Sequence, residues 1–97
     1  MTVTRLTPVA TLTERTVESA GERVRRLQAE ARQLAAEQVE ALAHDLTQLG
    51  AAAAEIASGG EAYPAGVREL SSRMAHDLVD KAQAMLVLLN RNRGAMA

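Results

Sequence analysis

A single cluster of glycine and proline constrains the fold of this chain more than any other feature: residues 58–66 read Ser-Gly-Gly-Glu-Ala-Tyr-Pro-Ala-Gly. Gly59 or Gly60 suits the left-handed residue that follows a helix, and Pro64 suits the first turn of the next helix. On either side of this cluster, apolar residues recur every three or four positions, which is the spacing of one helix face. Ala, Leu, Glu, Arg and Gln dominate both segments, so helix propensity agrees with the spacing. The sequence therefore predicts an all-α fold, an antiparallel two-helix hairpin.

Capping signals set the expected ends of the two helices. Thr11 and Glu14 form a capping-box pattern, and Asn90 followed by Arg91, Arg93 and Gly94 is typical of a helix C-terminus. We expect one hairpin domain over 11–90, with a long first helix and a shorter second one. The expected segments, in chain order, are a flexible N-terminus at 1–10, a helix at about 11–57, a turn at 58–63, a helix at about 64–90 and a flexible tail at 91–97.

The apolar spacing predicts one contact stripe on each helix. The expected stripe on the first helix is Val17, Ala20, Val24, Leu27, Ala31, Ala35, Val39, Leu42, Leu46, Leu49, Ala53 and Ile56. The expected stripe on the second helix is Val67, Leu70, Met74, Leu78, Ala82, Met85 and Leu89. Gly21 and Gly50 interrupt the first helix, and each is a local kink, a close backbone approach or a tolerated glycine.

The two expected helices differ in length, so part of the first helix has no partner within the same chain. At ~1.5 Å per residue, residues 14–57 extend about 66 Å and residues 64–90 about 40 Å, so the first helix overhangs the second by about 26 Å. Residues 85–89, Met-Leu-Val-Leu-Leu, are apolar around the whole helix, so packing on one side leaves part of them in water. We therefore predict a homodimer that completes an antiparallel four-helix bundle. The expected oligomer interface is Val17, Val24, Leu27, Leu34, Leu86 and Leu89.

Composition excludes several classes of function. The chain has no Cys, so thiolate metal sites and cysteine nucleophiles are excluded. It has one Tyr and neither Phe nor Trp, too little for aromatic stacking on nucleic acid. No apolar run approaches the ~20 residues of a membrane-spanning helix, and the N-terminus is a poor secretory signal. We expect a cytoplasmic protein without cofactor or metal, and an Arg- and Ala-rich composition indicates a bacterial, high-GC source.

Charge is unevenly distributed along the chain. Residues 33–67 hold five acidic residues and no Lys or Arg, whereas residues 15–32 hold five Arg. The expected basic patch, at the open end of the hairpin, is Arg23, Arg25, Arg26, Arg32, Arg91 and Arg93. This patch either grips an anionic partner or is a solvated helix surface. Because the net charge is -1, we do not expect a nucleic-acid binder.

The tetrapeptide Ala-His-Asp-Leu occurs once in each helix, at 43–46 and 75–78. The heptad position of His44 points outward and that of Asp45 flanks the stripe, which argues against a metal site. His44, Asp45 and Leu46 resemble the His-acid-Leu stretch of the dimerisation and phosphotransfer domains of histidine kinases. Thr47 and Leu49 stand where that family has a basic residue and a proline. The resemblance implies that His44 is the phosphoacceptor and Asp45 its acid/base partner.

Taken together, these patterns favour a non-enzymatic oligomerisation and protein-interaction module, an adaptor, scaffold or regulator. The expected partners are a second copy and an unidentified protein. One alternative is the histidine-phosphotransfer hairpin that uses His44. Another is an amphipathic surface-coating protein that resembles the Ala/Leu/Gln-rich phasins, suggested by the apolar residues 85–89.

Overall fold

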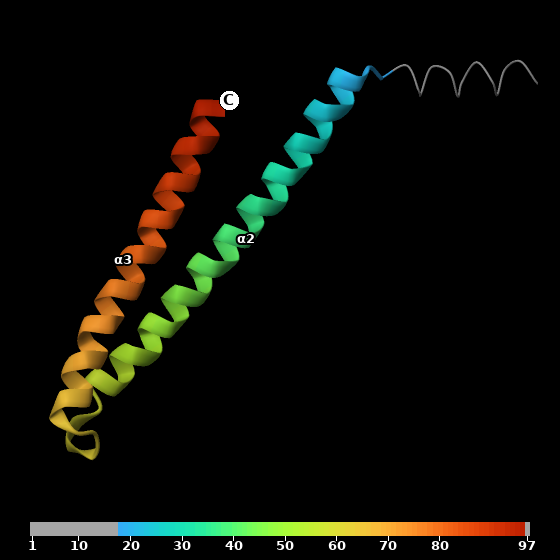
Figure 1. Cartoon of the computed structure of the whole chain (residues 1–97). Helices are drawn as coiled ribbons and strands as arrows, with labels where there is room; N and C mark the ends of the chain where they lie inside the picture. Colours follow the sequence, from blue (N-terminus) through green and yellow to red (C-terminus); the bar gives the residue numbers. More distant parts are fainter. Residues whose placement is uncertain (1–17, 97) are drawn as a thin grey trace, which may run out of the picture. The chain divides into compact units, whose positions relative to one another are not determined.

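The structure, a computed structural model, describes residues 18–96, and the side chains of residues 18–93. It consists of helix α2 (Ala20–Ala57), the short 3-10 turn η1 (Gly60–Ala62) and helix α3 (Ala65–Met96) (Figure 1). The two helices pack against each other, and no strand occurs within residues 18–96. The predicted all-α helical hairpin is therefore confirmed.

The chain divides into two compact units between Leu34 and Ala35. The first unit contains the N-terminal turns of α2. The second unit contains the remainder of α2, the turn η1 and α3. The second unit is therefore the hairpin proper, and it holds the contacts between α2 and α3 described below.

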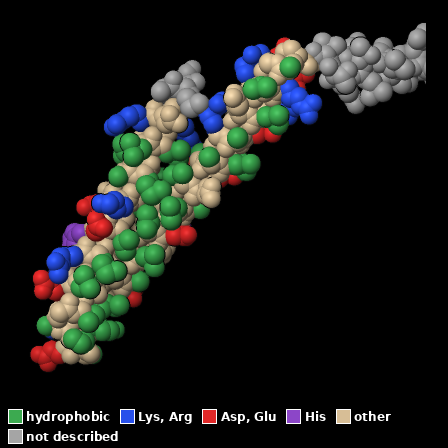
Figure 2. Space-filling view, in the orientation of Figure 1, with side chains coloured by type: hydrophobic (Ala, Val, Ile, Leu, Met, Phe, Trp, Pro, Cys, Tyr) green, Lys and Arg blue, Asp and Glu red, His purple; other side chains and the backbone are tan. Residues whose placement is uncertain are grey.

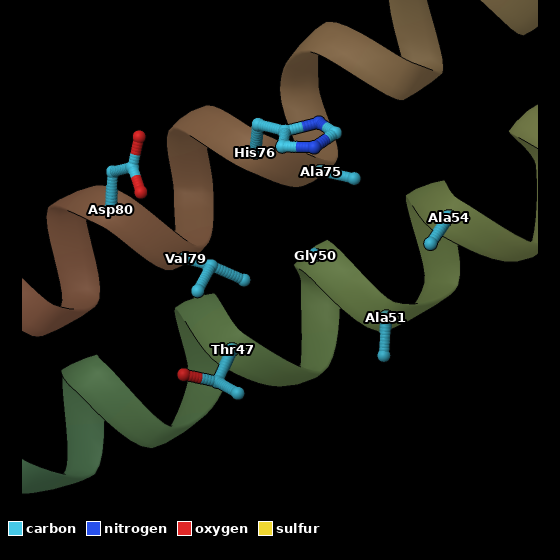
Figure 3. A pocket seen from close by; sticks show the side chains of 8 residues that line it. All are labelled: Thr47, Gly50, Ala51, Ala54, Ala75, His76, Val79 and Asp80. Atoms are coloured by element: carbon cyan, nitrogen blue, oxygen red, sulfur yellow. The ribbon is translucent and has the colours of Figure 1, made fainter.

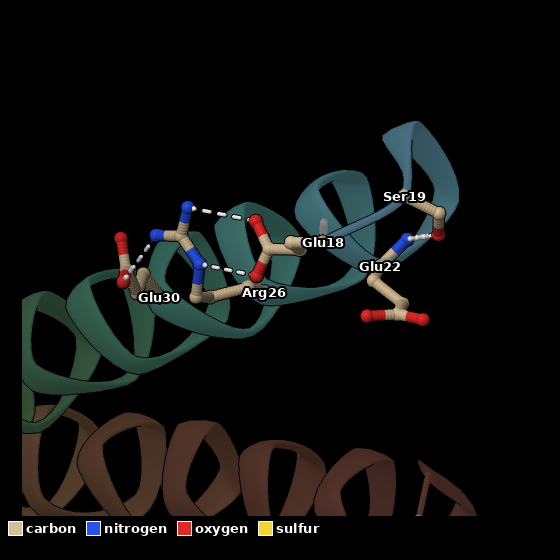
Figure 4. A network of polar contacts seen from close by, with 5 residues as sticks. All are labelled: Glu18, Ser19, Glu22, Arg26 and Glu30. Carbon is tan, nitrogen blue, oxygen red and sulfur yellow. Dashed lines mark hydrogen bonds and ion pairs between the residues drawn. The ribbon is translucent and has the colours of Figure 1, made fainter. Parts of the chain in front are cut away.

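Helix α2 begins at Ala20 because Ser19 caps it. The backbone N–H of Glu22 donates to the Ser19 hydroxyl oxygen at 3.0 Å, which satisfies one of the free donors of the first turn (Figure 4). The expected start at Thr11 lies outside the described residues. The carboxylate of Glu22 in the first turn also suits the positive end of the helix dipole.

Helix α3 continues to Met96, beyond the expected end at 90. Arg91 and Arg93 thus belong to the helix, and Arg93 Nη2 donates to Glu40 Oε1 of α2 at 2.8 Å. The helices contain 38 and 32 residues, so α2 is longer by about 9 Å instead of the expected 26 Å. The predicted overhang was too large for two reasons: α2 begins at Ala20 and not near residue 14, and α3 does not stop at its C-terminal cations.

The bend uses both of its adjacent glycines. Gly60 has a φ of +80°, the left-handed conformation expected for Gly59 or Gly60. The ring of Tyr63 packs on Gly59, where a Cβ atom would lie 2.7 Å from Tyr63 Cδ2. Pro64 directly precedes α3, and its carbonyl accepts the N–H of Arg68 at 3.0 Å. The expected turn at 58–63 agrees with this arrangement.

Small residues form the contact between α2 and α3. The buried positions within the described residues are Ala36, Ala43, Gly50 and Ala53 on α2, and Ser71 and Ala82 on α3. At Gly50 the helices approach so closely that a Cβ atom would lie 3.0 Å from Val79 Cγ2 and 3.2 Å from the Ala75 carbonyl oxygen. Of the explanations considered for Gly50, the close backbone approach is confirmed.

The predicted contact stripes were partly wrong. Ala53 and Ala82 are buried, and Val39, Leu46, Leu78 and Met85 are half-buried, as expected. Five large stripe residues of the second unit are exposed instead: Leu42, Leu49, Val67, Leu70 and Met74. Ala36, Ala43 and Gly50 recur at seven-residue intervals and let the backbones come close, so the inward face of α2 is centred on them. The large side chains are consequently displaced to one flank of the contact.

Candidate functional site: an exposed apolar face

The large side chains excluded from the helix contact form the candidate site. We define the apolar face as six side chains, each between 46% and 59% exposed: Leu42, Leu49, Val67, Leu70, Met74 and Leu88. Figure 2 shows apolar side chains gathered along both helices of the hairpin on the side facing the viewer. A patch of this kind on a small protein is typical of an interaction surface.

Helical periodicity explains why these residues share one side. Leu42 and Leu49 lie one residue before the buried Ala43 and Gly50, so both flank the inward row of α2 on the same edge. On α3, Leu70 precedes the buried Ser71, and Met74 precedes the half-buried Ala75. Because the helices are antiparallel, these two flanks lie on the same side of the hairpin.

Two opposite charges lie at the margins of the apolar face. Met74, Lys81 and Leu88 follow one another at seven-residue intervals, so Lys81 occupies the same row of α3 as the two apolar residues. On α2, Asp45 and Leu42 together line a shallow hollow of about 430 Å³. The apolar face therefore carries an acid at the α2 margin and a base at the α3 margin.

The predicted interface residues have mixed surroundings. In the first unit, Val24, Leu27 and Leu34 are 51%, 47% and 66% exposed, and Val17 lies outside the described residues. In the hairpin, Leu86 is exposed and Leu89 is half-buried. Val87 and Leu88 are also exposed, as expected for the residues 85–89 of a helix packed on one side. Their role as an interface stays a prediction.

The arginines of the predicted basic patch belong to separate groups. Arg23, Arg25, Arg26 and Arg32 lie in the first unit, and Arg91 and Arg93 lie in the second. Arg26 is engaged by Glu18 at 3.1 Å and by Glu30 at 3.4 Å (Figure 4). The hydrogen bond from Arg26 and the nearby positive charges lower the pKa of Glu18. Arg26 and Arg93 thus already hold carboxylates of their own chain, and anion binding by the patch stays a prediction.

The two histidines lie on exposed positions of their helices. His76 Nδ1 lies 2.9 Å from the carbonyl oxygen of Ser72, which accepts its proton. Residues 18–96 contain no group of three or more side chains that could hold a metal ion. His44 and Asp45 are both exposed, and the phosphoacceptor role that the histidine-kinase resemblance implies for His44 stays a prediction.

A second hollow, of about 380 Å³, lies beside the close approach of α2 and α3 at Gly50. Small residues and His76, Asp80 and Thr47 line it (Figure 3). The Thr47 hydroxyl donates to the carbonyl oxygen of Ala43 at 3.0 Å, so it is engaged within its own helix. This hollow is open and results from the absence of large side chains between the helices.

No protein-family model matches this chain, and no curated protein or solved structure matches it. Within residues 18–96, neither helix combines the length and the apolar character that crossing a bilayer requires.

Sequence periodicity located five of the six residues of the apolar face, all but Leu88, but assigned them to the contact between the two helices, where they are about half exposed. The signal that separates the buried row of α2 from the exposed row is the interval of seven between Ala36, Ala43 and Gly50. A heptad row of Ala and Gly beside a parallel row of Leu indicates a close helix pair with an unoccupied flank.

Proposed function

We propose that this protein is a non-enzymatic helical oligomerisation module that binds a second copy of itself through the apolar face. Four helices then enclose one core, in which the six large side chains of the face replace contact with water by contact with one another. Further protein partners of such an adaptor or regulator bind to the assembled bundle.

The proposal rests on one observation: the small side chains of the hairpin are buried, and many of its large apolar side chains are exposed. Small residues are buried between α2 and α3, whereas Leu42, Leu49 and Leu70 are about half exposed. Burial of a large aliphatic side chain contributes roughly 1.5–3 kcal/mol, far more than burial of Ala. The isolated hairpin therefore leaves about half of the burial available to these side chains unused, and a second copy supplies it.

Adjacent residues of α3 offer a matched test. Leu88 belongs to the apolar face, whereas Val87 is two residues from both Met85 and Leu89, half-buried residues on the inward side, and therefore points away from α2. The two side chains are 59% and 54% exposed. A glutamate on the apolar face places charges in the new core, but a glutamate at residue 87 stays in water.

The experiment is light scattering coupled to size-exclusion chromatography of the full chain at micromolar concentration. We expect a dimer mass for the parent chain and for Val87→Glu, and a monomer mass for Leu88→Glu. Circular dichroism checks that each variant remains helical. A monomeric parent chain, or equal masses for Leu88→Glu and Val87→Glu, refutes the proposal.

A further inference from the structure

We infer that the two copies pack with both bends at the same end, so that each α2 lies against α3 of the second copy. This inference rests on the proposed self-association and adds its orientation and register. It follows from the charges of the two helices within the hairpin and from the levels at which their residues lie.

Two symmetric arrangements bring the apolar face onto a copy of itself. A two-fold axis parallel to the helices places the bends together and sets α2 beside α3 of the second copy. A two-fold axis across the helices places the bends at opposite ends and sets α2 beside α2 and α3 beside α3. Both arrangements cover the same apolar side chains, so hydrophobic burial does not distinguish them.

Charge distinguishes the two arrangements. Residues 35–57 of α2 contain four acidic residues, Glu37, Glu40, Asp45 and Glu55, and no Lys or Arg. Helix α3 contains five basic residues, Arg68, Arg73, Lys81, Arg91 and Arg93, and three acidic ones, Glu69, Asp77 and Asp80. Like-charged helices repel when paired, and complementary ones select the orientation. The arrangement with the bends together pairs each acidic helix with a basic one.

The same arrangement fixes the register, because rotation about an axis parallel to the helices leaves every residue at its own level. Gly50 lies at the level of Ala75, Leu78 and Val79. In an antiparallel pair, a step of five residues back along α2 from Gly50 matches a step of five residues forward along α3 from residues 75–79. Asp45 therefore lies at the level of residues 80–84.

Lys81 is the basic residue at this level. It lies at the α3 margin of the apolar face, and Asp45 lies at the α2 margin. Packing α2 on α3 of the second copy brings these two margins together, so Asp45 of each copy meets Lys81 of the other. In the single chain, Lys81 Nζ pairs with Asp77 at 3.2 Å. Both of these side chains are about two-thirds exposed, so exchanging that partner costs little.

The first test measures the distance between the two bends. The chain has no Cys, so Glu61→Cys in the exposed turn η1 gives one spin label per copy. We expect a dimer mass and a label separation below about 30 Å, a few helix diameters. A dimer with its bends at opposite ends gives a label separation of more than about 40 Å, because the 32 residues of α3 extend about 48 Å.

These outcomes separate the two proposals. A dimer with the long separation overturns the orientation and leaves self-association intact. A monomer at every concentration, with no short distance, overturns both. Binding of the chain to another protein or to a lipid surface also overturns both proposals, if the chain forms no dimer when that partner is absent.

The second test reverses the charges at the margins. Asp45→Lys and Lys81→Asp should each raise the dimer dissociation constant, by about 2- to 30-fold, since a symmetric dimer contains the pair twice. The double variant should recover most of this loss at low salt. The control is Asp80→Lys, the same kind of change at a residue that lines the hollow beside Gly50, away from the face. Equal effects of Asp80→Lys and Asp45→Lys, or no recovery in the double variant, overturn the register.

Discussion

Truncation of Leu49 tests quantitatively whether the apolar face becomes buried. Leu49→Ala removes a large part of the α2 row and retains high helix propensity, so the isolated hairpin should fold as before. The matched control is Val87→Ala on the outward side of α3. The exposed fractions of the two side chains, 58% and 54%, are nearly equal.

The expected magnitude follows from the exposed fraction. Full burial of a Leu side chain contributes roughly 1.5–3 kcal/mol. Since 58% of Leu49 is exposed in the single chain, a second copy gains about 1–1.7 kcal/mol from it. A symmetric dimer contains this contact twice, which gives about 2–3.5 kcal/mol, or about 30- to 300-fold in the dissociation constant. These figures are upper values, because Ala retains one methyl group.

Sedimentation equilibrium or dilution-dependent circular dichroism measures this dissociation constant. We expect the Leu49→Ala value to rise by one to two orders of magnitude and the Val87→Ala value to stay within about threefold of the parent. Equal dissociation constants for all three chains would refute the reasoning, since they would show that a half-exposed Leu gains no burial on association.

Two further predictions concern the packing of α2 and its N-terminal ion pairs. Gly50→Leu should lower the melting temperature, with a loss of about 1–3 kcal/mol, because even a Cβ atom there would lie 3.2 Å from the Ala75 carbonyl oxygen. Gly21→Leu, where the nearest contact is the flexible end of Arg25 at 3.5 Å, should not destabilise the chain in the same thermal melt. Because Arg26 lowers the pKa of Glu18 below 4.5, their contact stabilises the start of α2 fully above about pH 4.5 and is lost as the pH falls through that lowered pKa. An NMR titration of the Glu18 carboxyl carbon should therefore show its midpoint rising in Arg26→Gln, and an unchanged midpoint would contradict this account.

Local chemistry made the hairpin predictable. Gly60 adopts the left-handed conformation that a glycine after a helix permits, and Pro64 precedes α3 as its lack of an N–H favours. The exposure of Val87 and Leu88 was also predictable, because no helix packed on one side buries residues all around its axis. Each of these features depends on a few neighbouring residues.

The orientation of α2 toward α3 was not predictable from apolar spacing. A prediction from apolar spacing places large residues such as Leu42 and Leu49 in the contact. The contact between α2 and α3 is instead determined by how closely the two backbones can approach. That distance depends on Gly50 and the alanines in its row, whose low hydrophobicity gives them little weight in such a pattern. The C-terminus of α3 was missed for a related reason, since the contact of Arg93 with Glu40 depends on tertiary placement.

The seam of Ala36, Ala43 and Gly50 has a thermodynamic consequence for the presented surface. Alanine and glycine have no side-chain rotamers to lose, so closing α2 onto α3 freezes little side-chain motion. The alanine Cβ is fixed by the backbone and glycine has no Cβ, so neither residue can adapt by rotation, and the main chain sets the spacing between the rows of leucine on the two helices. In the proposed dimer, the hairpin would serve as a template with a preorganised backbone, and the entropic cost of ordering the large side chains would arise on association.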